Sequence, residues 1–335
     1  KMQKSKLLII SLLPLKPVKS GYQNSVFLLF EFLKKKFDIN FFNLNNENNI
    51  DPVLNLNIGS DLNKIENIIK NFKPENIIVN TTKLLFLLQK VLLKNNIKPI
   101  LLIHDLYFFR KKYFKSLGVV DNMPLSKVEE LKLINSTKIT LDFSIKEKSF
   151  LLNNGVDSRR LIYTHTAIKS FKKKINLKKN HTILFVGSQW KQNFNNIKTF
   201  FQKNYTHFKE KKFLIIGPKL IGAKKNVSFV DYSKNHFYKS RIGIAPIKPH
   251  CGRNVKIFEM MSAGLPVFTN LDLSDYGLKN LKHYCKVPNQ NWRLFINKYY
   301  DDLKFLNKIA GNAKRWTLKR NNFRYAYSKI LKHLN

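Results

Sequence analysis

Acidic residues are scarce in this sequence. Of its 335 residues, 21 are Asp or Glu and 61 are Lys or Arg, which gives a formal net charge of +40. A surface this positive attracts polyanions, and nucleic acid, an anionic membrane and a phosphorylated glycan are all compatible partners. Charge alone does not select among them, and a solvated, lysine-rich surface without a fixed partner is the alternative.

Cysteine is also rare, with Cys251 and Cys285 as the two examples. Two thiols form neither a disulfide framework nor a zinc site, which favours a reducing compartment. The N-terminal run KMQKSKLLIISLLPLKP has the lysines and apolar residues of a signal peptide but no small-residue cleavage site. We therefore predict a buried first strand there, in a cytoplasmic protein.

Three further absences exclude whole classes of protein. No apolar run approaches about 20 residues, the length that crosses a bilayer. The fingerprint G-x-G-x-x-G is missing, so a nicotinamide or flavin enzyme is not predicted. No Asp-x-Asp motif follows a predicted strand and no group of metal-ligand residues is visible, which agrees with a chain that needs no metal and no cofactor.

Buried-strand patterns alternate with helical patterns along most of the chain. Strands separated by helices, with glycines and polar residues at their carboxyl ends, predict an α/β protein of two doubly wound, Rossmann-like domains that face a central cleft. The polar segment 173–180 separates the two halves as a linker, after a first domain at 1–172. The predicted strands are 6–13, 37–43, 76–80, 98–104, 138–142 and 160–164, then 181–187, 212–217, 226–230, 242–246 and 266–269.

The stretch HCGRNVKIFEMMSAGLPVFTN, residues 250–270, predicts an anion site. It reads as a polar loop, a helix at 255–263 and a strand, with Gly264 as a left-handed C-cap. Arg253, Lys256 and the amides of the helix N-terminus suit a phosphate. Glu259, one turn into the helix, could accept hydrogen bonds from two adjacent hydroxyls, as on a ribose. Together these residues predict a nucleotide-sugar site.

Two segments of the first half are candidates for acceptor chemistry. His104 and Asp105 end a predicted strand, where they could act as a general base or hold a sugar hydroxyl, or could be a satisfied polar strand end. Aromatic and basic residues then interleave at 106–118. That segment could lie on an anionic membrane or stack on single-stranded nucleic acid, or its aromatics could be core. The predicted surface residues are Tyr107, Phe108, Arg110, Lys111 and Lys112.

These motifs resemble the GT-B fold glycosyltransferases of the retaining, nucleotide-sugar-dependent group (glycosyltransferase group 1, family 4-like). ILFVGSQWKQNFNNIKTF resembles the family's strand, Gly-Ser loop and helix, and GRNVKIFEMMSAGLPVFTN resembles its Lys, Glu and Gly-x-Pro-Val signature. The first half is looser, with Gly21 matching the glycine loop and His104 a strand-end histidine. The resemblance spans nearly the whole chain and implies a donor domain at 181–314 and a helix at 315–335 that crosses back to an acceptor-side first domain.

The resemblance also implies the roles of individual residues. Glu259 would bind the ribose, the loop at 230–231 would contact the base, and His104 with Asp105 would be catalytic, without a metal. One departure concerns Cys251, beside His250, where many relatives carry a second glutamate. It leaves the donor sugar and the retaining outcome open. The implied donor-binding residues are Gly21, Gly187, Ser188, Lys191, Asn193, Gly217, Val230, Asp231, Gly252, Arg253, Asn254, Lys256 and Glu259.

The function that we predict is transfer of a hexose from a nucleoside-diphosphate sugar, with UDP favoured, to an envelope or lipid-linked glycan. A peripheral position on the inner face of the membrane would fit such an acceptor. A DNA glycosyltransferase acting on modified bases of viral DNA is an alternative, because it would also need a basic surface. A non-catalytic polyanion-binding protein with a degenerate donor site is another, and a sugar-phosphate epimerase of the same fold is weaker.

Overall fold

The chain folds into two compact α/β units. The computed structural model describes residues 4–16, 18, 21–44, 58–116, 118, 125–168, 171, 173–188, 191–220, 225–247, 254–288 and 291–334. The first unit runs up to Ala167 and resumes at Phe323, and the second extends from Ile168 to Asn322. The predicted linker, 173–180, lies within the second unit. The predicted crossing helix, 315–335, is not one helix: a helix of the second unit ends at Arg320, and a separate helix of the first unit begins at Phe323.

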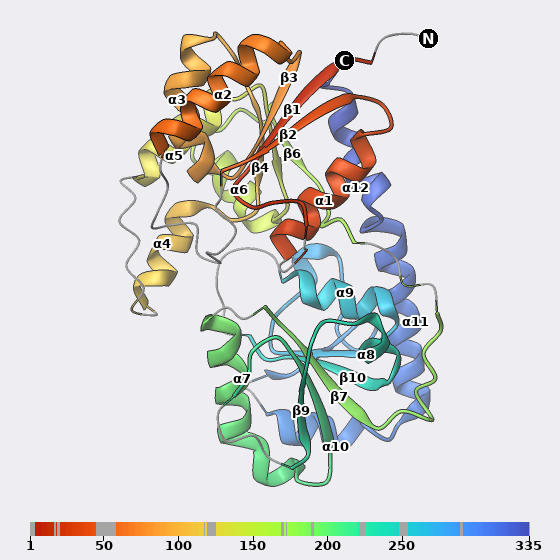
Figure 1. Cartoon of the computed structure of the whole chain (residues 1–335). Helices are drawn as coiled ribbons and strands as arrows, with labels where there is room; N and C mark the ends of the chain where they lie inside the picture. Colours follow the sequence, from red (N-terminus) through yellow and green to blue (C-terminus); the bar gives the residue numbers. More distant parts are fainter. Residues whose placement is uncertain are drawn as a thin grey trace. The chain divides into compact units, whose positions relative to one another are not determined.

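The first unit is built on a six-stranded parallel sheet in the order β2-β1-β3-β4-β5-β6 (Figure 1). Its strands are short and rich in Ile, Leu and Val, as is usual for strands covered on both faces. In β1, Leu7 and Ile9 belong to one core and Leu8 and Ile10 to another, because side chains alternate across a strand. The strands are β1 Lys6–Ser11, β2 Asp38–Asn43, β3 Asn76–Asn80, β4 Ile100–Ile103, β5 Ile139–Asp142 and β6 Leu161–Tyr163.

Helices cover both faces of this sheet. The helices α1 Gly21–Leu33 and α12 Phe323–Leu331 pack on the face of Leu7, and Tyr327 donates its hydroxyl hydrogen to the carbonyl of Ser25 at 2.7 Å. The face of Leu8 is covered by α2 Ile58–Phe72, α3 Thr82–Lys94, α4 Tyr107–Ser116, α5 Lys127–Asn135 and α6 Ile145–Asn153. The C-terminal helix α12 is thus an integral part of the first unit.

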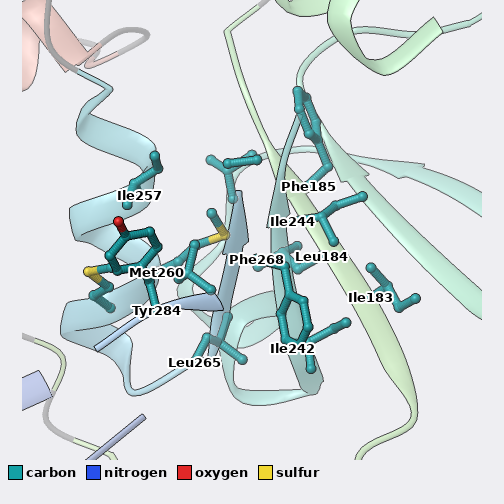
Figure 2. Close-up of a cluster of buried hydrophobic side chains, with 14 of the residues drawn as sticks. Ile183, Leu184, Phe185, Ile242, Ile244, Ile257, Met260, Leu265, Phe268 and Tyr284 are labelled. Atoms are coloured by element: carbon teal, nitrogen blue, oxygen red, sulfur yellow. The ribbon is translucent and has the colours of Figure 1, made fainter. Parts of the chain in front are cut away.

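The second unit repeats the design with the strand order β12-β11-β10-β7-β8-β9, again all parallel. Figure 2 shows its core, where Ile257 and Met260 of a helix meet Ile244 and Phe268 of the sheet. The strands are β7 Thr182–Val186, β8 Lys212–Ile216, β9 Val227–Val230, β10 Ser240–Ala245, β11 Val267–Thr269 and β12 Cys285–Lys286. The helical segments are α7 Lys191–Asn204, η1 Tyr205–Phe208, α8 Lys234–Tyr238, α9 Val255–Ala263, η2 Ser274–Tyr276, α10 Trp292–Tyr299 and α11 Leu303–Arg320.

The predicted fold class is confirmed: both halves are doubly wound α/β domains with parallel sheets. The elements that were not predicted include the helices α5 and α8 and the two-residue strand β12. Gly21, predicted to lie in a loop, is the first residue of α1. None of the described helices is long and apolar enough to cross a membrane. Cys285 is buried in β12, and Cys251 lies outside the described residues.

The left-handed conformation of Gly264 at the end of α9 can be tested by substitution. Gly264 has φ 90°, and its amide donates to the carbonyl of Met261 at 3.0 Å. A side chain there would be strained, so Gly264→Ala should lower the free energy of unfolding by about 1 to 2 kcal/mol. Gly311→Ala is the matched control. Gly311 lies inside α11, where alanine is the better helix former, so it should raise stability by up to about 1 kcal/mol. Urea denaturation of both variants checks the opposite signs, and equal losses would contradict the expected strain.

Candidate functional site

A chain of hydrogen bonds joins the start of α9 to the loop after β7. The ammonium of Lys256 donates to Oδ1 of Asn193. The Nδ2 group of Asn193 donates to the carbonyl and to the hydroxyl oxygen of Ser188, both at 3.1 Å. Lys256 is the second residue of α9, Asn193 is the third residue of α7, and Ser188 lies just after β7. The three residues therefore form one polar cluster at the carboxyl ends of the strands, where open α/β sheets bind their ligands.

Two glycines make this cluster compact. Gly187 and Gly217 directly follow β7 and β8, and a Cβ added to Gly217 would lie 1.9 Å from the carbonyl oxygen of Gly187. A Cβ on Gly187 would lie 2.9 Å from Cγ of Asn193. Gly217 also has φ 106°, a conformation that favours glycine. Glycine at both positions lets the strand ends and the Asn193 side chain approach one another.

Lys256 carries its charge in an unusual setting. Its ammonium lies 5.2 Å from the ring centroid of Phe185, and the described partner of its hydrogen bond, Asn193, is uncharged. Burial lowers the pKa of Lys256 to about 7, because the charged form loses hydration without gaining an opposite charge. An anion placed at this ammonium would supply that charge and favour the protonated form.

One turn further along α9, Glu259 accepts a hydrogen bond from the hydroxyl of Tyr232. Tyr232 follows β9, is 53% exposed and packs its ring on Phe237 with centroids 5.9 Å apart. Burial raises the pKa of Glu259, and the nearby Lys234 partly opposes that rise. The hydroxyl of Tyr232 thus bonds to one carboxylate oxygen of Glu259, on the same helix as Lys256. Tyr232 was not among the predicted site residues, although its place as an aromatic residue just past a strand end was the available signal.

The described donor-site candidates of the second unit gather at one end of the sheet. Asn254 is the N-cap of α9, and Val230 and Asp231 lie at the carboxyl end of β9. Lys191 is the first residue of α7. Gly252 and Arg253, together with His250 and Cys251, lie outside the described residues. Gly21 belongs to the first unit, where it begins α1.

The first unit has a second polar cluster, centred on His104. The imidazole Nε2 of His104 lies 2.8 Å from Oδ1 of Asn80, which ends β3 and is fully buried. The ring stacks on Phe143 with centroids 5.1 Å apart, and Tyr22 lies against it at 4.8 Å. Burial, with a smaller contribution from the charge of Arg110, lowers the pKa of His104 to about 3. His104 is therefore neutral near pH 7. With Nε2–H donating to Asn80, Nδ1 is left as a hydrogen-bond acceptor.

Among the described contacts, the hydrogen bond of His104 is to Asn80 rather than to the adjacent Asp105. Asp105 instead lies 4.0 Å from Arg110, and both side chains are about one-third exposed. Asn80 was not a sequence candidate, although it too ends a strand beside the one before His104.

The aromatic segment after His104 is also less exposed than predicted. Tyr107 is buried, and the ring of Phe108 packs on Phe109 and Phe150 with centroids 4.1 and 5.0 Å apart. The buried carboxylate of Glu130 holds the start of α4 by accepting the amides of Tyr107 at 2.6 Å and Phe108 at 2.9 Å. The prediction that Tyr107 lies on a binding surface is therefore wrong, since it is a core residue. Lys111 and Lys112 are exposed, and Arg110 is partly exposed.

Within the described part of the chain, no three His, Cys, Asp or Glu side chains come together as a metal-binding group.

No protein-family model matches the sequence, and no curated protein matches it. Solved structures do match. Anabaena Alr3699/HepE in complex with UDP and glucose aligns with a TM-score of 0.72 and 12% identity, covering 98% of this chain and 99% of that one. Sucrose-phosphate synthase from Thermosynechococcus elongatus gives 0.73 and 12%, with 99% of each chain covered. A putative UDP-N-acetylglucosamine 2-epimerase from Listeria monocytogenes gives 0.60 and 14%, covering 98% and 95%. The chain thus has the two-domain GT-B fold, which the sequence resemblance had implied.

The setting of His104 predicts a pH-dependent contribution to stability. Its pKa falls from 6.5 in the unfolded chain to about 3 in the fold, so between these values the unfolded state binds a proton that the native state does not. Stability should therefore decrease as the pH falls below 6.5. His104→Gln removes this contribution. Between pH 7 and pH 5 the free energy of unfolding of the variant should therefore fall by on the order of 1 kcal/mol less than that of the wild type.

Urea denaturation at the two pH values measures this difference. His207→Gln, at an exposed histidine of η1, is the control for loss of an imidazole. Equal acid sensitivity in the wild type and His104→Gln would contradict a buried, neutral His104.

Proposed function

We propose that the chain is a glycosyltransferase that moves a hexose from a UDP-sugar to a hydroxyl of an acceptor. The observation that carries this proposal is the cluster of Lys256, Asn193 and Ser188, with Glu259 one turn along α9, at the carboxyl ends of a parallel sheet. Its support is the GT-B fold, in which Anabaena HepE was solved in complex with UDP and glucose.

In this proposal Lys256 and the amides at the start of α9 face the diphosphate. Cleavage of the bond between the sugar and the diphosphate adds one negative charge to the terminal phosphate of the departing UDP, and a fixed ammonium and a helix N-terminus stabilise that charge. Asn193 holds the ammonium without neutralising it. Glu259 accepts hydrogen bonds from the ribose hydroxyls in place of the hydroxyl of Tyr232. His104 uses Nδ1 to orient a hydroxyl of the sugar or of the acceptor.

The acceptor that we propose is an envelope or lipid-linked glycan, supported by the net charge of +40, which suits an anionic acceptor or membrane. The reaction needs no metal in this proposal, because cations and helix ends take that role. Incubation of the purified chain with UDP-sugars tests the function through release of UDP. Activity that survives EDTA supports a metal-free reaction. A UDP-sugar converted to its epimer, without UDP release, would identify an epimerase instead.

The pKa of Lys256 predicts how UDP binding depends on pH. Bound diphosphate favours the charged ammonium, so above pH 7 binding must take up a proton. Affinity for UDP should therefore fall between pH 7 and pH 9, by up to about tenfold per unit. Lys256→Arg stays charged and should bind UDP with little pH dependence over that range. Isothermal titration calorimetry measures both, and a variant with the same slope as the wild type would exclude Lys256 as the titrating group.

The contact between Tyr232 and Glu259 predicts opposite effects of two substitutions on UDP affinity. Glu259→Ala should weaken binding by about tenfold to a hundredfold, because the ribose hydroxyls lose a charged acceptor. Tyr232→Phe removes the hydroxyl that competes for this carboxylate and should tighten binding severalfold. Weaker binding by Tyr232→Phe would mean that its hydroxyl contacts the nucleotide rather than competing with it.

A further inference from the structure

The outer face of α11 is a row of cations. The helix buries Leu306, Ile309, Ala310, Ala313 and Thr317. At about 100° per residue, four cations fall within an arc of about 60° on the opposite side, spread over about 22 Å of helix. They are Lys304, Lys308, Arg315 and Lys319, and all are exposed. The sequence contains no Asp or Glu after Asp302, so α11 itself offers no carboxylate to neutralise this row.

A turn at residues 279–284 widens the basic row. Asn312 of α11 donates to the carbonyl of Lys282 at 3.0 Å, and Arg315 donates to Oδ1 of Asn312 at 2.5 Å. The turn is thereby attached to the helix beside its cations. It adds the exposed Lys279 and Lys282. Of the acidic residues just before the turn, Asp272 is already paired with Lys286 at 2.6 Å.

Two leucines border these cations in solvent. Leu281 is 42% exposed at the tip of the turn and has φ 57°, a conformation that costs a leucine free energy. Its amide donates to the carbonyl of Tyr284 at 2.8 Å, so the turn is a defined structure. Leu318 is 40% exposed, and its position on α11 borders the row on the side away from the turn. Core packing explains neither side chain.

We propose that this surface, the α11 surface, docks the second unit on an anionic lipid bilayer. It consists of the outer face of α11 and the turn 279–284. Its cations face the headgroups, while Leu281 and Leu318 enter the interface. Leucines favour a bilayer over nucleic acid, since the described residues of this surface include no exposed aromatic ring on which a base could stack. The proposal goes beyond sugar transfer and does not depend on it.

Sedimentation of the full chain with vesicles tests the proposal. The wild type should bind vesicles of phosphatidylcholine mixed with phosphatidylglycerol and should not bind phosphatidylcholine alone. Combined Lys308→Glu, Arg315→Glu and Lys319→Glu substitutions should weaken binding by about a hundredfold. Leu281→Gly removes one apolar contact with the bilayer and should weaken binding by about fivefold. Glycine adopts φ 57° readily, so this substitution should leave the fold intact.

The matched control combines Lys203→Glu, Lys212→Glu and Lys225→Glu, which change the net charge equally at exposed lysines of α7, β8 and the turn before β9. This control should bind anionic vesicles like the wild type. Equal losses in the two triple variants would overturn the proposal, since total charge would then be the cause. The proposal would also be overturned if binding of the wild type to vesicles did not depend on phosphatidylglycerol. It would likewise be overturned if the wild type bound a labelled oligonucleotide through the same residues and bound no vesicle.

Discussion

The hydrogen bond between the Lys256 ammonium and the Asn193 amide is the interaction on which the candidate site depends. A carboxylate in place of Asn193 would neutralise Lys256 and leave little attraction for a phosphate. The amide orients the ammonium and leaves its charge available, at the expense of a pKa lowered to about 7. The glycines after β7 and β8 serve this contact, because side chains there would collide with the adjoining backbone and with Asn193.

The first unit uses the same device with a different titratable group. Asn80 pairs with His104 at 2.8 Å, and the rings of Phe143 and Tyr22 enclose the imidazole. A carboxylate partner would favour the imidazolium, whereas the amide leaves the ring neutral with one free acceptor nitrogen. In each unit an asparagine amide thus positions a titratable side chain without placing an opposite charge beside it. Asn80 lies at a strand end, and Asn193 lies in the first turn of a helix.

The sequence predicted the architecture well because strand hydrophobicity and strand-end glycines are local signals. Gly187, Gly217 and Gly264 were identified from the sequence by their places at the ends of predicted strands and of a predicted helix. In the structure each has a backbone or packing reason to be glycine. Pairings between distant residues could not be predicted. Glu130 caps α4 from a separate helix, and this contact helps to make Tyr107 a core residue.

Tyr232 and Asn80 were missed for a related reason. Each acts through a partner more than 20 positions away, and nothing in the adjacent sequence identifies that partner. Asp105 was grouped with His104 because the two adjoin in sequence, although a side chain after a strand end is free to turn towards Arg110. Adjacency along the chain was a poor guide to the hydrogen-bond partner of His104. Adjacency of β3 and β4 in the sheet would have been a better one.

A crystal structure of the chain with UDP would show directly whether Lys256 and Glu259 bind the nucleotide. We expect the diphosphate oxygens within hydrogen-bond distance of the Lys256 ammonium, and the ribose hydroxyls bonded to Glu259. The hydroxyl of Tyr232 should be displaced from that carboxylate. UDP bound elsewhere, with the Tyr232–Glu259 hydrogen bond intact and Lys256 still bonded to Asn193 alone, would contradict this expectation.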